Sequence, residues 1–216
     1  MRDLQGLQRS LGFAGDTAAV TRYQRPYVDR FPAGGRVLDV GCGEGIFLQL
    51  LRDGGRTGVG VDRSPEDVAL ARAKGLEVVE EDALAYLAGQ REAFDGVFCA
   101  HVIEHLVPAD AVRLIEGARA ALRPGGRLVL ITPDTLDLET LTERFWLDLT
   151  HVRPYPLPLL VALVKALGFE LLDQGNDPRS ARSRTLRNTP RRFLRWLRFG
   201  PHAYRGDAFV FAARPR

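Results

Sequence analysis

The chain has 216 residues, of which 45% are hydrophobic and 26% are charged, and its formal net charge is +3. This balance is typical of a globular protein with a sizeable core, so residues 1–216 are expected to form one domain. No apolar run reaches the length of a membrane span and the first residues lack a hydrophobic signal region, which favours a cytoplasmic protein.

The first part of the chain alternates between apolar strands and helices. Residues 1–16 have little periodicity and are expected to form a loose arm. Hydrophobic spacing, with Thr17 and Ser64 as helix caps, predicts helix 17–30, strand 36–40, helix 46–52, strand 57–61, a helix after Ser64 and strand 76–80.

The second part continues this alternation and then becomes irregular. It predicts strand 96–100, helix 108–122, strand 127–131, a helix near 138–145, helix 156–167, a strand from 169–172 and a last strand 207–212. Strands that alternate with helices in this way indicate an α/β protein whose parallel sheet has right-handed crossovers.

A basic insertion precedes the last strand. Residues 179–205 contain nine arginines and no acidic residue. We expect either a solvated surface arm or an arm that contacts an anionic partner, such as a membrane surface, a lipid-linked phosphosugar or RNA. In the second case the arm would bind a membrane surface, which would make the protein membrane-peripheral, or it would bind nucleic acid. Nucleic acid is the less favoured of these partners.

A glycine-rich turn follows the first strand, and a carboxylate ends the second. Gly41, Gly43 and Gly45 let the backbone pass close to a ligand, and Asp62 can accept from ribose hydroxyls. The dinucleotide pattern G-x-G-x-x-G fails because residue 46 is Ile, and no Gly-Lys-Ser/Thr follows for a P-loop. The acidic Glu44 would repel a pyrophosphate. The turn therefore favours a nucleoside cofactor without phosphates.

Five segments resemble, in order, the motifs of class I S-adenosylmethionine-dependent methyltransferases, including bacterial glycan-associated and ubiquinone-type O-methyltransferases. They are residues 37–45, 61–64, 81–83, 94–100 and 122–130. The resemblance covers about residues 17–175. It implies an α/β, Rossmann-like doubly wound sheet of seven strands, mostly parallel, with an antiparallel last strand.

The resemblance also implies S-adenosylmethionine as cofactor, with S-adenosylhomocysteine as product. Asp39 and Gly41 would meet the methionine end, Asp62 would hold the ribose, and Asp82 would accept from the adenine amine. Asp82 could equally cap a helix, and the two roles are compatible. The full expected set is Asp39, Gly41, Gly43, Gly45, Asp62, Arg63, Asp82, Ala83 and Ala100.

Three of the four histidines fall in the loops expected to face the methyl group: His101, His105 and His151. In the preferred interpretation one of them is a general base for a hydroxyl acceptor. In a second interpretation, the three histidines hold a divalent metal together with Glu104. The stretch from His101 to His105 resembles the metal-binding stretch of the small-RNA 3′-terminal 2′-O-methyltransferases, but it has His101 where that family has Glu. In a third, the Glu104-His105 pair only packs and caps. No metal is assigned.

The loop over 145–156 resembles the acceptor-side loop of bacterial methyltransferases associated with glycan and O-antigen biosynthesis. Trp146 and Tyr155 would either stack on a sugar or plug the core, Arg153 would pair with an anionic group, and Asp148 would orient His151. We therefore expect O-methylation of a sugar or another small hydroxylated metabolite. The alternatives are a metal-assisted RNA 2′-O-methyltransferase and a non-catalytic module that binds the cofactor.

Overall fold

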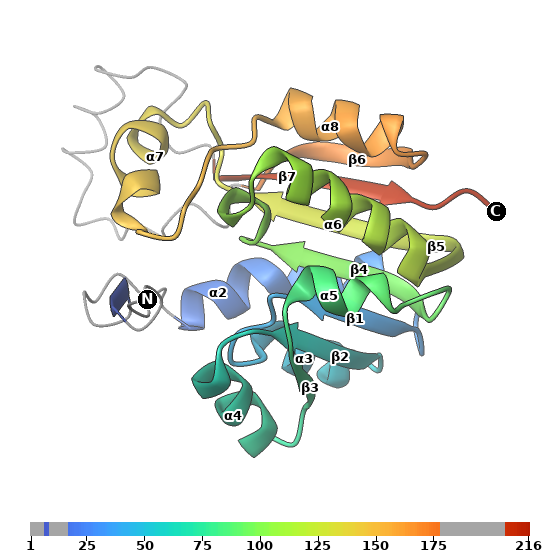
Figure 1. The fold of residues 1–216 in the computed structure, drawn as a ribbon. Coiled ribbons are helices and arrows are strands. Elements are labelled where there is room, and N and C mark those ends of the chain that lie inside the picture. The colour runs from blue at the N-terminus through green and yellow to red at the C-terminus, as the bar shows by residue number, and fades with distance from the viewer. Residues whose placement is uncertain (1–6, 9–16, 178–205) are drawn as a thin grey trace.

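The computed structural model describes residues 7–8, 17–177 and 206–216 (Figure 1). The basic insertion predicted over 179–205 lies outside the described residues, as does the predicted N-terminal arm apart from residues 7–8. Among the described helices, none has the length and apolar character that a membrane span requires.

Seven strands form one sheet in the order β3-β2-β1-β4-β5-β7-β6. Strands β1 to β5 pair in parallel, whereas β7 runs antiparallel to both of its neighbours, β5 and β6. The predicted Rossmann-like sheet with an antiparallel last strand is thus confirmed. The strands are β1 (Arg36–Val40), β2 (Thr57–Asp62), β3 (Glu77–Glu80), β4 (Phe94–Ala100), β5 (Leu122–Thr132), β6 (Glu170–Asp177) and β7 (Asp207–Ala213).

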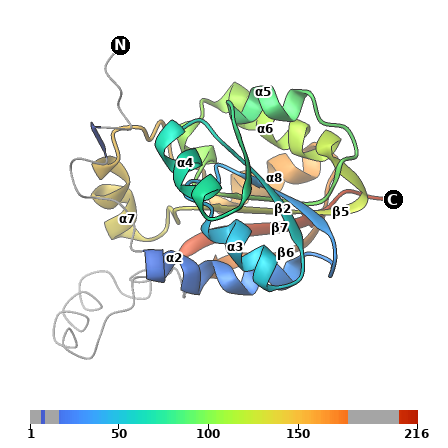
Figure 2. The ribbon, with the colours of Figure 1, turned by 90° about the horizontal axis from the view of Figure 1, so that it is seen from below.

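Helices cover both faces of this sheet, with α5 and α6 on one side and α2 and α3 on the other (Figures 1 and 2). The α-helices are α2 (Thr17–Gln24), α3 (Ile46–Asp53), α4 (Pro65–Ala73), α5 (Ala83–Ala88), α6 (Pro108–Ala121), α7 (Leu138–Thr142) and α8 (Leu157–Ala166). Three short 3₁₀ helices join them: η1 (Arg25–Arg30), η2 (Ile103–His105) and η3 (Arg144–Leu147).

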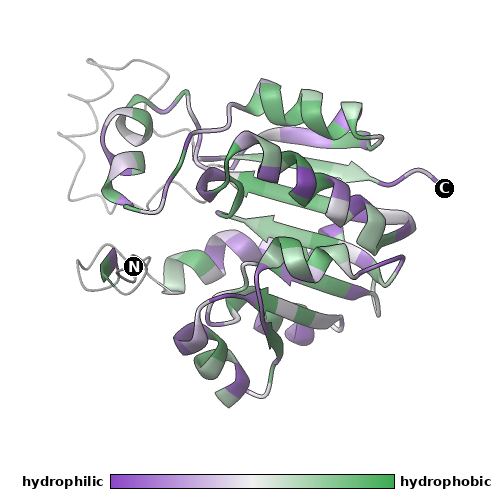
Figure 3. Cartoon of the chain, in the orientation of Figure 1, coloured by the Kyte–Doolittle hydropathy of each residue, from purple (hydrophilic) through white to green (hydrophobic). Residues whose placement is uncertain are grey.

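Side chains that alternate along the central strands divide the core into two layers. Leu38 and Val40 of β1 pack in the layer of α5, α6 and α8, whereas Val37 packs in the layer of α2, η1, α3 and α4. The central strands are apolar along nearly their whole length (Figure 3), as strands buried on both faces must be. Asp39 belongs to the second layer by the same alternation, and this places a buried carboxylate beneath α2.

The helix predicted near 138–145 ends at Thr142 as α7 and is followed by η3. Two further differences, at α2 and α5, have a local physical reason. The helix predicted over 17–30 ends at Gln24 and continues as the 3₁₀ helix η1, because Pro26 has no N–H to donate and its ring crowds the preceding turn. Helix α5 was not predicted as a helix. It begins directly after Asp82, whose carboxylate accepts hydrogen bonds from the Leu84 and Ala85 N–H groups.

The carboxyl ends of the parallel strands gather on one side of the molecule. In Figure 1 the arrows of β4 and β5 point toward the side where α7 and the start of α2 lie. Val40 of β1 is in register with Val61 of β2, so the glycine-rich turn and Asp62 leave the sheet side by side. This edge is where α/β sheets bind their ligands.

Candidate active site

The three glycines of the turn after β1 all have positive φ: 71° at Gly41, 51° at Gly43 and 81° at Gly45. A Cβ on Gly41 would collide with Val102, and one on Gly45 would collide with the side chain of Leu76. Only Gly43 faces open space. Backbone conformation therefore favours glycine at all three positions, and packing requires it at Gly41 and Gly45 as well. Gly43 alone leaves clearance for a ligand.

Asp62 ties the glycine turn to the end of β2. Its carboxylate accepts hydrogen bonds from the Gly43 N–H at 2.8 Å and from the Ser64 N–H at 2.9 Å. Glu44, in the same turn, forms an ion pair with Lys74 at 2.9 Å and accepts a hydrogen bond from Thr17. Because this pair compensates its charge, Glu44 is a weaker argument against a phosphate ligand than the sequence suggests.

A cavity of about 160 Å³ opens beside Asp62. Asp82, on its rim, uses Oδ1 for both bonds that cap α5, so Oδ2 takes no part in the capping. The expected residues that line this cavity are Gly41, Asp62, Arg63, Asp82, Ala83, His101 and His105. The proposed ribose and adenine contacts thus lie around one cavity.

A second cavity, of about 240 Å³, lies beneath α2 and shares Gly41 and His101 with the first. It is lined by three more of the expected residues, Asp39, Gly43 and Ala100. Asp39 is 3% exposed, and burial together with the neighbouring Asp62 carboxylate raises its pKa well above the ordinary value. A cation placed in this cavity would relieve that electrostatic penalty.

Gln24 is a cavity-lining residue that the sequence analysis missed. Its side chain is buried, and Oε1 has no hydrogen-bond partner among the described residues. A buried acceptor without a partner is costly, and a ligand that donates a hydrogen bond would satisfy it. Gln24 Oε1 and the Asp39 carboxylate together suit an ammonium group. No sequence pattern marks Gln24, because one glutamine on a helix carries no motif.

Two of the expected residues line neither cavity. Gly45 precedes α3 in a left-handed conformation and packs on the protein itself. His151 lies behind His105, with 4.7 Å between the ring centroids, and its Nδ1 bonds to the Phe145 carbonyl oxygen at 2.6 Å. The roles expected of these two residues stay predictions.

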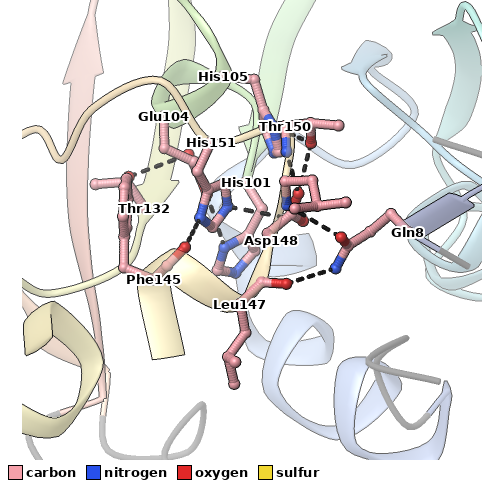
Figure 4. Close-up of polar contacts among 11 residues, drawn as sticks. Gln8, His101, Glu104, His105, Thr132, Phe145, Leu147, Asp148, Thr150 and His151 are labelled. Atoms are coloured by element: carbon pink, nitrogen blue, oxygen red, sulfur yellow. Dashed lines mark hydrogen bonds and ion pairs between the residues drawn. The ribbon is translucent and has the colours of Figure 1, made fainter. Parts of the chain in front are cut away.

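His101 is held between two carboxylates. Nδ1 lies 3.2 Å from Glu104 Oε1 (Figure 4). Nε2 lies 3.4 Å from Asp207 Oδ2. Burial lowers the pKa of His101, but Tyr23, Asp207 and Glu104 outweigh burial and raise the pKa well above its ordinary value. With both ring nitrogens occupied and a proton held, His101 is poorly suited to accept another proton.

His105 is in the opposite protonation state. Burial lowers its pKa below the ordinary value, and the nearby His151 lowers it further, although Glu104 and Asp148 act the other way. The side chain lines the first cavity and is neutral at neutral pH. Of the three candidate histidines, His105 therefore has the surroundings of a general base.

Glu104, His105 and His151 also offer ligand atoms within 4.8 Å of one another, the spacing of a metal site. Glu104 is fully buried, and its two oxygens already contact His101 and accept from the Thr132 hydroxyl. A metal ion would have to share or replace these contacts. The donor set consequently suits a metal less well than His105 suits a base.

The side chains of the loop over 145–156 differ in part from their expected roles. Tyr155 is 1% exposed and donates a hydrogen bond to the Leu106 carbonyl oxygen, so it is a core residue and cannot stack on a sugar. Arg153 packs over its ring at 5.0 Å. Trp146 is 57% exposed. Asp148 lies 3.9 Å from His151 Nε2, but its shorter contacts are with Thr150.

Comparison with known proteins supports the same family. A methyltransferase domain model matches residues 17–174. A ubiquinone biosynthesis O-methyltransferase of Xanthomonas axonopodis pv. citri (strain 306) is 39% identical over 109 residues, which are 47% of this chain and 44% of that protein. A similar enzyme of Haemophilus ducreyi is 35% identical, again over 109 residues and 45% of its length. The match thus spans less than half of these curated relatives.

Solved structures extend the similarity to nearly the whole chain. A SAM-dependent methyltransferase from Archaeoglobus fulgidus has a TM-score of 0.76 and 25% identity, covering 94% of this chain and 96% of that one. The 1,6-didemethyltoxoflavin-N1-methyltransferase of Burkholderia thailandensis, solved with S-adenosylhomocysteine, shares the fold at a TM-score of 0.65 and 19% identity, covering 93% and 82%. The chain therefore belongs to the methyltransferase domain family and has the fold of class I S-adenosylmethionine-dependent methyltransferases.

Proposed function

We propose that the protein transfers the methyl group of S-adenosylmethionine to a hydroxyl oxygen of a small metabolite, with His105 as the general base. The observation that carries this proposal is a neutral histidine that lines the same cavity as Asp62 and Asp82. The names of the relatives support oxygen as the methylated atom, because they are ubiquinone biosynthesis O-methyltransferases.

The two adjoining cavities would take the two halves of the cofactor. Asp62 and the Asp82 oxygen that does not cap α5 would hold the ribose and the adenine amine. Asp39 and Gln24 would hold the ammonium of the methionine end, where a buried carboxylate and an unsatisfied oxygen require a donor. When bound, the cofactor supplies a methyl group activated by its sulfonium.

His105 would remove the acceptor's proton as the acceptor oxygen takes the methyl group. The acceptor O–H bond breaks, its proton passes to an imidazole nitrogen, and its electron pair stays on the oxygen that forms the new bond to the methyl carbon. The bond between that carbon and the sulfonium would break with its electron pair left on sulfur, so that S-adenosylhomocysteine is the leaving group. Proton transfer is most effective when acceptor and base have similar pKa values. A phenolic hydroxyl, whose pKa is about 10, matches imidazole better than a sugar hydroxyl does. A small phenolic acceptor is therefore favoured over the sugar.

The test is transfer of a labelled methyl group to a simple catechol, a monosaccharide and an RNA oligonucleotide, each with and without a chelator. We expect transfer to the catechol that is insensitive to chelator, and a loss of about 100-fold or more in kcat for His105→Gln. Affinity for S-adenosylmethionine, measured by calorimetry, should be retained in that variant. Full activity of His105→Gln would remove the general-base assignment.

A metal-assisted RNA 2′-O-methyltransferase is the second candidate, and the proximity of Glu104, His105 and His151 is the observation in its favour. Transfer to RNA that disappears with chelator would favour it over the phenolic acceptor. Cofactor binding without transfer to any of the acceptors would favour a non-catalytic module. The three readings thus give different results in one assay.

A further inference from the structure

Thr150 lies between a carboxylate and the candidate base, although it is 45 residues from His105 in the sequence. Its hydroxyl oxygen is 2.9 Å from His105 Nδ1 and 2.6 Å from Asp148 Oδ1 (Figure 4). The Thr150 N–H donates to the same Asp148 oxygen at 2.8 Å. A tight turn from Asp148 to Thr150 therefore holds the hydroxyl in place against the imidazole.

The direction of these hydrogen bonds follows from the chemistry of the three groups. Burial raises the pKa of Asp148, but the two bonds from Thr150 and the nearby His151 and His105 outweigh it and lower the pKa, so Asp148 is ionised and can only accept. A hydroxyl has one hydrogen, and here Asp148 receives it. The Thr150 oxygen must then accept from His105, whose Nδ1 carries the proton.

We propose that Thr150, anchored by Asp148, is a positioning residue that keeps His105 in the tautomer protonated on Nδ1. In a neutral imidazole this leaves Nε2 as the nitrogen that can accept a proton. The chain of hydrogen bonds from His105 through Thr150 to Asp148, called the relay below, is a property of the resting protein. Only the final step, in which Nε2 receives the acceptor's proton, rests on the proposed function.

The other groups that face His105 do not compete for Nδ1. His151 uses its own Nδ1 on the Phe145 carbonyl oxygen, which can only accept, and the ring of Phe145 packs on that of His151 at 4.3 Å. Glu104 directs its oxygens to His101 and Thr132. Thr150 thus supplies the hydroxyl that contacts His105 Nδ1, and a backbone hydrogen bond with Thr150 also raises the pKa of His105. Glu104, Asp148 and His151 complete the charged surroundings of His105.

The relay would also stabilise the product of proton transfer. When Nε2 gains the acceptor's proton, the imidazolium keeps its Nδ1–H bond to Thr150, which in turn donates to the anionic Asp148. This chain ends on a negative charge, so it favours the charged form of His105 over the neutral form. Thr150 would consequently act on kcat and leave cofactor binding unchanged.

The test is ¹⁵N NMR of histidine-labelled protein, which distinguishes a protonated ring nitrogen from a bare one. In the resting wild-type protein, without cofactor or acceptor, we expect His105 to show a protonated Nδ1 and a bare Nε2. Thr150→Val removes the acceptor and should populate the other tautomer, whereas Thr150→Ser should restore the wild-type pattern. Thr57→Val, on β2 away from the cavities, is the matched control.

Kinetics provide the second readout. Thr150→Val should lower kcat about tenfold, the equivalent of one hydrogen bond, with unchanged affinity for S-adenosylmethionine and recovery in Thr150→Ser. A bare Nδ1 in the wild-type protein would overturn the proposal whether or not any variant folds. If the tautomer is as expected but no acceptor is methylated, the proposed function fails and the relay stands.

Discussion

His101 and His105 are the same residue type, four positions apart, and their surroundings place them in opposite states. The carboxylates of Asp207 and Glu104 hold a proton on His101, whereas burial and His151 keep His105 neutral. Both histidines were predicted from the sequence as candidate general bases, and the sequence could not rank them. Part of the ranking comes from Asp207 at the start of β7, which is far away in the chain and lies 3.4 Å from His101 Nε2.

Two substitutions separate the proposed halves of the cofactor site. Asp62→Asn should weaken binding of both S-adenosylmethionine and adenosine by about 10-fold to 100-fold, because charge-assisted bonds to the ribose are lost. Gln24→Met should weaken S-adenosylmethionine by about fivefold and leave adenosine unaffected, because only the ammonium contact is lost. Isothermal titration calorimetry measures both, with the exposed Asp53→Asn as the matched control. Equal losses for the two ligands in Gln24→Met would contradict its placement.

At the scale of single elements, caps and breakers decide where helices begin and end. Ser64 was predicted as a cap from Ser-Pro followed by two acidic residues, and its side chain does accept a hydrogen bond from Asp67 N–H. Helix α5 escaped prediction because its six residues, from Ala83 to Ala88, are too few to establish a helical period. Its cap, Asp82, was predicted only as a residue that could either cap a helix or accept a hydrogen bond from the adenine amine.

Ser64→Ala should reduce the free energy of unfolding by about 1 kcal/mol, because the Asp67 N–H at the start of α4 loses its acceptor. Ser64→Thr keeps a hydroxyl and should lose much less. Denaturant unfolding of the three proteins measures this directly. A loss in Ser64→Thr as large as that in Ser64→Ala would mean that the buried site responds to side-chain volume and not to the cap.

At the scale of the whole molecule, the alternation of strands and helices was sufficient to predict the parallel part of the sheet. The ends of β1, β2 and β4 follow from apolar runs that stop at Gly41, Asp62 and His101, and those ends place the two cavities. The antiparallel β7 came from the resemblance to known methyltransferases, because no local pattern specifies that the last strand inserts between β5 and β6.

The sequence could not predict contacts between loops that the sheet brings together. Thr150 and His105 meet because the loop after β5 folds back against the loop after β4, and Val152 N–H donates to the Glu104 carbonyl oxygen to fix that approach. Asp148 was expected to orient His151, but its short contacts are with Thr150. Whether Asp148 contacts His151 or Thr150 depends on a difference in distance of about an ångström. Spacing along the chain does not encode such a difference.

The central claim is that neutral His105 removes the acceptor's proton, and the pH dependence of kcat/KM tests it most directly. Only the neutral form can act, so the rate should fall as pH drops through the pKa of His105 and stay level above it. Because burial depresses that pKa, the acidic limb should lie below 6.5, the ordinary histidine value, and should vanish in His105→Gln. An acidic limb at or above 6.5, or the same limb in wild type and His105→Gln, would contradict the account.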